Sequence, residues 1–160
     1  MRGDAEHSLE IQLPFLQHQL GDFRLVPVLT SADDPAVARR LADALAQVVR
    51  QRSAAGEHVL LVASSDLHHI DNYNEVVRRD QAVVDSIAAY DLETLTRLLV
   101  SPGSSVCGRM PILAVLHAAK MLGANEVTIL HHTNSGDVTG QRLDGQYTVG
   151  YMAAAVTRPG

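Results

Sequence analysis

The loop Ser64-Ser-Asp-Leu-His-His69 carries the residue types with the clearest chemical potential. Asp66 and His69 are three residues apart, so a single turn can bring the carboxylate to a ring nitrogen. Such a pair can orient a histidine as a base, an acid or a metal ligand. A structural Asx turn or helix cap that leaves His68 exposed is the alternative. We expect Asp66 and His69 to be catalytic residues.

Cys107 is the only cysteine of the sequence. A single cysteine cannot form a disulfide within these 160 residues. The lack of an internal disulfide is typical of a reducing cytosol and predicts a cytoplasmic protein. The sequence predicts that Cys107 opens a helix, whose positive end favours the thiolate that binds metals or attacks substrates. Gly108 permits close approach of the backbone to a ligand, and Arg109 follows as a candidate pocket residue. The alternative for Cys107 is a buried small hydrophobic side chain.

The N-terminal segment places Asp4, Glu6 and His7 near the start of a predicted helix. The helix dipole alone favours carboxylates there, so Asp4 and Glu6 have a structural explanation. We keep Glu6 and His7 as candidate pocket residues. Eight histidines beside one cysteine raise the question of a metal. Three of these histidines look structural or solvated: His18, His58 and His117.

Length and composition set the limits of these hypotheses. The 160 residues, 46% of them hydrophobic, suit one domain with a real core. The net charge of −5 argues against a nucleic-acid partner or an anionic membrane surface. No apolar run approaches the roughly 18 residues of a membrane helix, and the first residues lack the apolar core of a signal peptide. The motifs of zinc fingers, zincins, hydrolase elbows and Rossmann dinucleotide sites are absent.

Helical and strand patterns alternate along the chain. The predicted helices cover residues 6–20, 34–56, 73–90, 91–99 and 107–122, and the predicted strands cover 23–29, 58–63, 127–130 and 147–157. Pro14 should kink or interrupt the first helix. This alternation favours an α/β fold, an αβα sandwich with a largely parallel or mixed sheet. Ligands bind beyond the carboxyl ends of such strands, where the 64–69 loop, His131 and His132 fall.

Three segments resemble one family when they are taken together and in order. They are Glu6-His-Ser-Leu-Glu-Ile-Gln-Leu-Pro-Phe15, Ser64-Ser-Asp-Leu-His-His69 and Val106-Cys-Gly-Arg-Met-Pro-Ile112. The loop 134–140 and the ending 149–154 extend the match over nearly the whole chain. The set resembles the Memo family, also called AmmeMemoRadiSam system protein B.

The resemblance implies a fold similar to the class III, LigB-type extradiol dioxygenases, which use non-haem iron. It implies a metal pocket in which Cys107 is a ligand together with two histidines, with iron first and copper second as the metal. Asp66 and His69 match further pocket residues, and His7 lies in a motif near the pocket. The implied role is redox chemistry on a small molecule or peptide, with AMMECR1-like and radical SAM proteins as partners.

The sequence also departs from the family pattern. The segments that supply the two metal histidines find no match, so we expect residues 1–160 to be the C-terminal portion of a Memo-like domain. It would lack its N-terminal strands and expose an apolar edge. The alternatives are that a partner completes the site or that the site is lost. A dioxygenase-like pocket retained only to bind a peptide or metabolite is the competing function.

Overall fold

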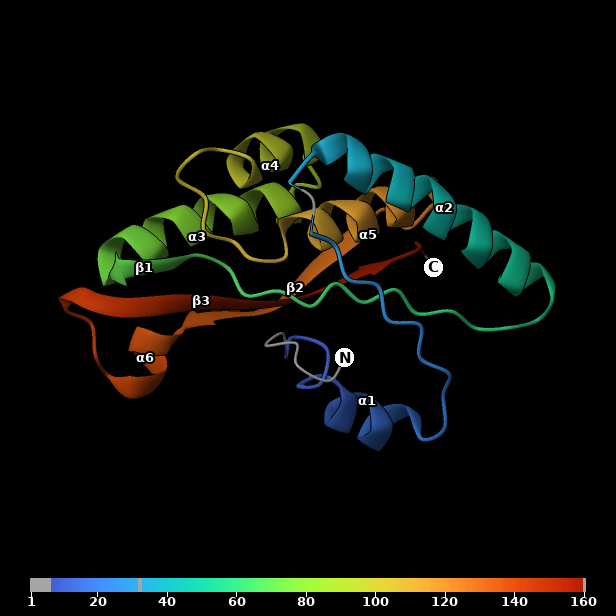
Figure 1. Cartoon of the computed structure of the whole chain (residues 1–160), viewed down its shortest axis with the longest axis horizontal. Coiled ribbons are helices and arrows are strands. Elements are labelled where there is room, and N and C mark those ends of the chain that lie inside the picture. Colours follow the sequence, from blue (N-terminus) through green and yellow to red (C-terminus); the bar gives the residue numbers. More distant parts are fainter. Residues whose placement is uncertain (1–6, 32, 160) are drawn as a thin grey trace. The chain divides into compact units, whose positions relative to one another are not determined.

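The computed structural model describes residues 7–31 and 33–159, which form two units, Met1–Ser31 and Ala32–Gly160. The first unit contains helix α1, Leu13–Leu20 (Figure 1). Pro14 lies in the first turn of α1, where its missing N–H is not needed. Residues 8–12 form turns and not helix, so the chain shows the predicted interruption and not a kink. The predicted helix start at Glu6 lies outside the described residues. The predicted strand 23–29 is also wrong, because no strand forms there.

The second unit is a mixed α/β fold. Four helices, α2 to α5, lie on one side of a small sheet (Figure 1). The helices are α2 (Pro35–Ala54), α3 (Tyr73–Ala88), α4 (Leu92–Leu99), α5 (Arg109–Met121) and the short α6 (Ser135–Thr139). The strands are β1 (His69–Asn72), β2 (Glu126–Asn134) and β3 (Asp144–Thr157). None of the described helices combines the length and hydropathy needed to cross a membrane.

Local capping fixes the helix starts that the sequence predicted. The Asp34 side chain accepts a hydrogen bond from the Ala36 backbone N–H at 2.8 Å, with Pro35 at the first helical position of α2. Asp91 caps α4 in the same way, at 3.0 Å from the Thr94 nitrogen. These contacts involve near neighbours in sequence, which is why they could be predicted from residue types alone.

The sheet is antiparallel, with strand order β1-β3-β2 among the described residues. The prediction of a largely parallel sheet is therefore wrong. The long strand β3 lies between the other two, and pairs with β2 after only the short connection that holds α6. Residues 58–63 are extended but join no ladder among the described residues, so they are not the buried parallel strand that we expected. His131 and His132 lie within β2 and not beyond its end.

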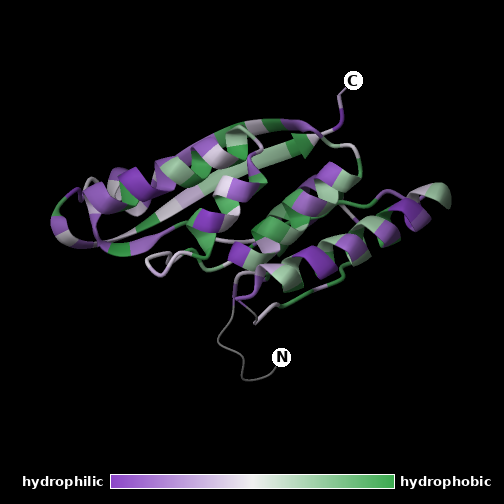
Figure 2. Cartoon of the chain, turned by 90° about the horizontal axis from the view of Figure 1, so that it is seen from above, coloured by the Kyte–Doolittle hydropathy of each residue, from purple (hydrophilic) through white to green (hydrophobic). Residues whose placement is uncertain are grey.

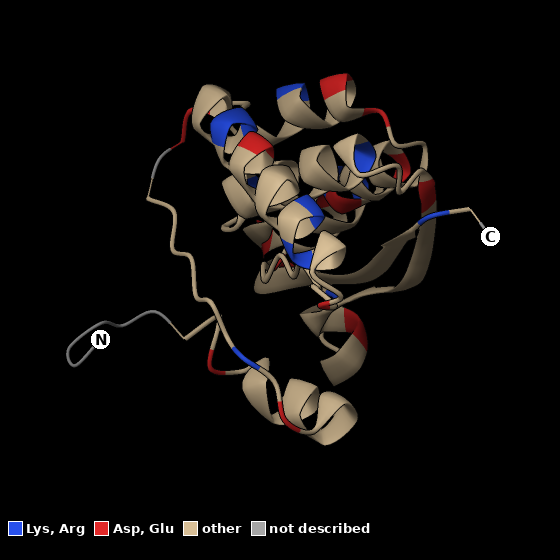
Figure 3. Ribbon diagram, turned by 90° about the vertical axis from the view of Figure 1, so that its right-hand side faces the viewer, with Lys and Arg blue, Asp and Glu red and all other residues tan. Residues whose placement is uncertain are grey.

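The core lies between the helices and the sheet. Figure 2 shows apolar and polar residues mixed along the long helices, and Figure 3 shows charged residues both on the helices and on the segments between elements. Large side chains that are fully buried come from α3, α4 and α5: Val83, Ile87, Leu95, Leu99, Met110 and Leu113. Beside this core, Leu61 packs inward from the extended segment 58–63, whereas Leu60 and Val62 are 66% and 50% exposed.

Candidate functional site

The start of strand β1 separates the two neighbouring histidines of the 64–69 loop. His69 pairs with Val149 of β3 in the antiparallel register. Successive side chains of a strand point to opposite faces, so His68 and His69 project in opposite directions. His68 is buried toward α3, where it contacts Asp80. His69 lies on the face that also carries Tyr147 and Tyr151 of β3, because each tyrosine is two positions along the strand from Val149, the partner of His69.

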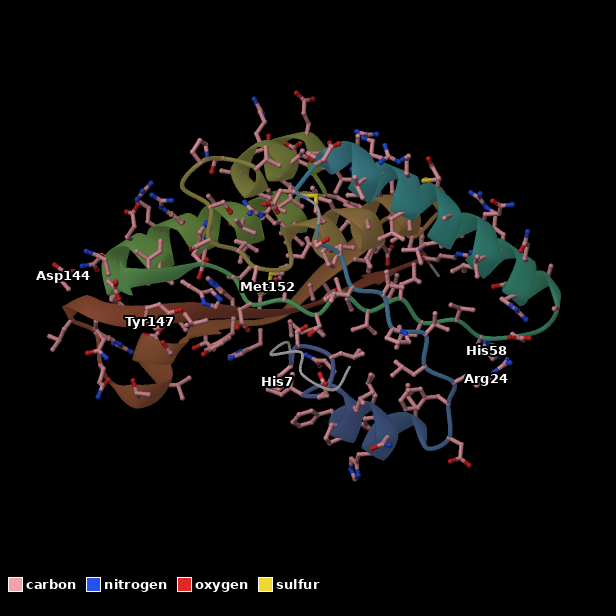
Figure 4. The ribbon with its side chains drawn as sticks, viewed as in Figure 1. His7, Arg24, His58, Asp144, Tyr147 and Met152 are labelled. Atoms are coloured by element: carbon pink, nitrogen blue, oxygen red, sulfur yellow. The ribbon has the colours of Figure 1, made fainter. Side chains whose placement is uncertain are left out.

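His69 is held between a phenol and a carboxylate. Its Nδ1 lies 3.0 Å from the Tyr147 hydroxyl, and the two rings meet edge to face with centroids 6.2 Å apart. Its Nε2 is buried, has no hydrogen bond to any of the described residues, and lies 3.6 Å from Asp66 Oδ2. That distance is longer than a hydrogen bond but close enough for charge attraction. Figure 4 shows Asp144, Tyr147 and Met152 following one another along β3. The structure thus brings Asp66 and His69 together, as the sequence predicted.

Ser65 connects this pair to the cysteine. The Ser65 hydroxyl accepts a hydrogen bond from the Gly108 backbone N–H at 2.8 Å and lies 3.7 Å from Cys107 Sγ. It also donates to the Asp66 carbonyl at 2.6 Å. One hydroxyl therefore joins the loop that carries Asp66 to the turn that carries Cys107. Cys107 is exposed and precedes α5 by two residues, so it does not itself open the helix.

Gly108 allows this approach. A Cβ atom added to Gly108 would lie 2.4 Å from Ser65 Cβ and 2.9 Å from the Ser64 carbonyl oxygen. Both distances are shorter than real Cβ contacts. The sequence predicted that Gly108 permits close approach of the backbone to a ligand, whereas the structure shows a close approach to the 64–69 loop of the same chain.

Ser105 fixes the backbone of the central histidine. Its hydroxyl accepts from the His69 N–H at 2.8 Å and donates to the His69 carbonyl at 3.0 Å. The Ser105 hydroxyl thus bonds to both the backbone N–H and the backbone carbonyl of His69, and both bonds are partly buried. The residues just before Cys107 therefore hold His69 as well.

Tyr151 lies within the electrostatic influence of Asp66 and Tyr147. Burial, the charge of Asp66 and the neighbouring Tyr147 raise the pKa of the Tyr151 phenol above its usual value, in that order of size. An anionic Asp66 disfavours a second negative charge at Tyr151, because like charges destabilise each other. Tyr151 therefore stays protonated near neutral pH and can donate a hydrogen bond into this region.

The other candidate residues have separate surroundings. The Arg109 guanidinium pairs with Asp33 at 3.0 Å and donates to the Leu99 carbonyl at 3.4 Å. His7 is exposed in the first unit, and its carbonyl accepts from the Ile11 N–H. Glu6 lies outside the described residues. The pocket roles of Glu6, His7 and Arg109 therefore stay predictions.

The described residues do not bring together enough donors for the metal that the family resemblance implies. Within residues 7–31 and 33–159, no three His, Cys, Asp or Glu side chains converge as a metal site would require. Structural and catalytic sites for transition metals take at least three protein ligands. The described residues alone do not fit a metal centre, although the exposed Cys107 thiol can supply one ligand.

Sequence reasoning missed four residues of this region. Ser65, Ser105 and Tyr147 hold the loop and His69, and Asp80 holds His68. Only two aromatic residues lie on β3, and their spacing by four places both on one face of a strand. That spacing could have indicated Tyr147 and Tyr151. No local pattern could have paired Asp80, in the middle of a helix, with His68.

Comparison with known proteins decides the family. The family model described as Memo-like protein matches residues 2–155. The chain belongs to the Memo-like protein family. A MEMO1 family protein of Methanosarcina mazei is 38% identical over 94% of this chain and 55% of its own length. One from Thermotoga neapolitana is 39% identical over 95% of this chain and 51% of its own. One from Aeropyrum pernix is 38% identical over 94% and 52%.

This Memo-like chain spans about half the length of the curated relatives it matches. The resemblance seen in the three segments of sequence is confirmed over nearly all of the chain. The activity, substrates and partners of the whole protein belong to the proposals that follow.

Proposed function

We propose that this chain is part of a metal-binding, dioxygenase-like protein with a redox role, in which the Cys107 thiolate supplies one metal ligand. The observation that carries the proposal is the Ser65 hydroxyl, which lies 3.7 Å from Cys107 Sγ and donates to the Asp66 carbonyl. It ties the turn that carries the thiol to the chain segment that carries Asp66 and His69. Thiolate together with imidazole suits Fe, Cu(I) or Zn. Iron is the first choice and copper the second.

The remaining ligands come from outside the described residues in this proposal. Residues 1–160 then form the C-terminal portion of a larger Memo-like domain. The exposed Leu60 and Val62, on an extended segment without a ladder, support this because an apolar edge favours a neighbouring strand.

Asp66 and His69 serve proton transfer in this proposal. An ionised Asp66 can only accept hydrogen bonds, so it favours the proton on the His69 Nε2 that faces it at 3.6 Å. His69 Nδ1 then accepts from the Tyr147 hydroxyl at 3.0 Å. The imidazole can pass a proton from one nitrogen while it receives one at the other. Tyr147 would hold the ring in the orientation that this exchange needs.

Metal analysis of the full-length protein tests Cys107 directly. We expect Cys107→Ser to lose most of its bound iron or copper, because a serine hydroxyl is a poor ligand for these metals. Met121→Ser, which removes an exposed sulfur at the far end of α5, is the matched control and should keep its metal. Unchanged metal content in Cys107→Ser would rule out this cysteine as a ligand.

A binding module without turnover is the second candidate. It is favoured by the lack of three converging donors within the described residues. Oxygen consumption by the full-length, iron-loaded protein with catechols separates the two functions. Steady turnover that falls in Asp66→Asn and His69→Gln supports the enzyme. A protein that binds peptide or metabolite but consumes no oxygen supports the module.

AMMECR1-like and radical SAM proteins are the macromolecular partners of this proposal, and family resemblance is their support. Mixing the purified full-length proteins pairwise on a sizing column tests them. Co-elution at a stoichiometric ratio is expected. Separate elution at concentrations up to about 100 μM, corresponding to a binding free energy weaker than about −5.5 kcal/mol, would remove them as stable partners.

A further inference from the structure

His68 and Asp80 form a buried pair behind the candidate site. The two side chains are only 5% and 1% exposed, and His68 Nδ1 lies 2.8 Å from Asp80 Oδ1. The same oxygen accepts the His68 backbone N–H at 3.0 Å. Asp80 Oδ2 is buried and has no hydrogen-bond partner in the part of the chain that the structure describes. The carboxylate of α3 thus holds both the ring and the backbone of His68.

The contact is expensive to bury. A carboxylate taken out of water loses its solvation, and a buried pair of this kind is often no more stable than an apolar replacement. Asp80 also leaves one oxygen unpaired, which adds a desolvation cost. Net stabilisation is therefore a poor explanation for the pair. Fixing one geometry among several is the better one.

Strand β3 also holds the backbone of Leu67 and His68, through Gly150. The Leu67 N–H donates to the Gly150 carbonyl at 2.8 Å, and the Gly150 N–H donates to the His68 carbonyl at 3.0 Å. A Cβ added to Gly150 would lie 1.6 Å from Asp80 Oδ2. The absence of a side chain at Gly150 is what lets the carboxylate reach His68.

We propose that Asp80 is a positioning residue for the candidate site. By fixing His68 against Gly150, it sets the backbone of residues 67–69 and so the directions of Asp66 and His69 on the opposite face. The proposal rests on the proposed proton-transfer role of Asp66 and His69. It does not depend on the metal role of Cys107.

Amide hydrogen exchange of the full-length, metal-free protein tests the proposal. In Asp80→Ala we expect the Leu67 and Gly150 amides to exchange at least about tenfold faster relative to the amides of the β2–β3 ladder, because the opening is local. We also expect loss of the through-space proton contact between the His69 and Tyr147 rings.

Asp80→Asn and Asp85→Ala are the matched variants. Asparagine keeps an accepting oxygen in the same place. Asp80→Asn should therefore keep slow exchange at the Leu67 and Gly150 amides and keep the His69–Tyr147 contact. Asp85 lies on the same helix but is exposed, and its carboxylate accepts a hydrogen bond from the Gln81 side chain, so Asp85→Ala should change neither the amide exchange nor the His69–Tyr147 contact. If Asp80→Asn instead shows fast exchange at these amides and loses the contact, an accepting oxygen at position 80 is not what fixes His68, and the proposal is overturned.

The proposal is overturned if amide exchange in Asp80→Ala becomes faster by the same factor across the whole sheet while the His69–Tyr147 contact is retained. Asp80 would then be a core residue only. If Asp80→Ala does not fold, Gly150→Ala replaces it, because its methyl would take the place of Asp80 Oδ2. The same local loss is then expected, and a uniform loss refutes the proposal. A failed metal assay for Cys107 leaves these measurements unaffected.

Discussion

Replacing Gly108 by alanine perturbs the contact between the 64–69 loop and the cysteine turn. The φ angle of Gly108 is −92°, which alanine adopts without strain, so the effect comes from contacts alone. The new Cβ would lie 2.4 Å from Ser65 Cβ, 2.6 Å from Ser65 Oγ and 2.9 Å from the Ser64 carbonyl oxygen. The loop must move away, and the hydrogen bond from Gly108 to Ser65 is lost with it.

The size of the effect follows from three contributions. Overpacking costs about 1–3 kcal/mol, the lost hydrogen bond costs about 1 kcal/mol, and the stiffer unfolded chain returns about 0.4–1 kcal/mol. We expect Gly108→Ala to lower the free energy of unfolding by about 1–3.5 kcal/mol. Reversible denaturation in urea, followed by circular dichroism, measures this change.

Gly103→Ala is the matched control. The nearest atoms to its Cβ would belong to the guanidinium end of Arg79, which donates to the Gly103 carbonyl and pairs with Glu75. Shifting this partly exposed group costs about 1 kcal/mol or less, so we expect a smaller loss than in Gly108→Ala. In the double variant Ser65→Gly with Gly108→Ala the main clash is absent. Its loss of unfolding free energy should therefore be smaller than the sum of the losses in the two single variants. A Gly108→Ala protein as stable as the parent would refute the close approach.

Three further predictions concern the rest of the fold. Asp34→Ala removes the cap of α2 and should cost about 0.5–2 kcal/mol in thermal or urea unfolding. The 160-residue chain should self-associate through its exposed 58–63 edge, and Leu60→Lys with Val62→Lys should lower its mass in light scattering. Burial raises the pKa of Tyr90 to about 12, so its neutral form stabilises the fold below pH 10, and that contribution is lost as the pH rises from 10 to 12.

Each of these has its own control. For the cap, Asp43→Ala on the exposed side of α2 should change stability little, and an equal loss would contradict the capping argument. For the edge, a monodisperse monomer of the unsubstituted chain at high concentration would contradict the exposed-edge argument. For the tyrosine, Tyr90→Phe should flatten the alkaline loss of stability, and an unchanged slope would assign that loss to other groups.

Local chemistry was sufficient for much of the helical structure. The α2 and α4 starts followed from Asp34 and Asp91, whose carboxylates cap backbone N–H groups two or three residues away. The end of α5 followed from Gly123, which has a φ of 81° that glycine adopts freely. Pro14 correctly indicated that the predicted helix 6–20 does not run through, because proline is accommodated in a first turn but not in a helix interior.

The strands were harder to predict because a strand exists only with its partner. The apolar run 58–63 reads as a buried parallel strand, yet it pairs with nothing in the described part of the chain. The direction of pairing depends on how the chain returns, and β3 returns beside β2 after a short connection. Alternation of side chains records the faces of a strand but not the direction of its neighbours.

The sequence by itself determined the family, the helix caps, and the closeness of Asp66 and His69, since each depends on residues that are near in sequence or on ordered motifs. Tertiary structure alone decided the antiparallel sheet and the partners of both histidines. Tyr147 reaches His69, and Asp80 reaches His68, only because the β1–β3 register and α3 bring together residues that are 78 and 12 positions apart. Such contacts depend on packing and register, which no local pattern contains.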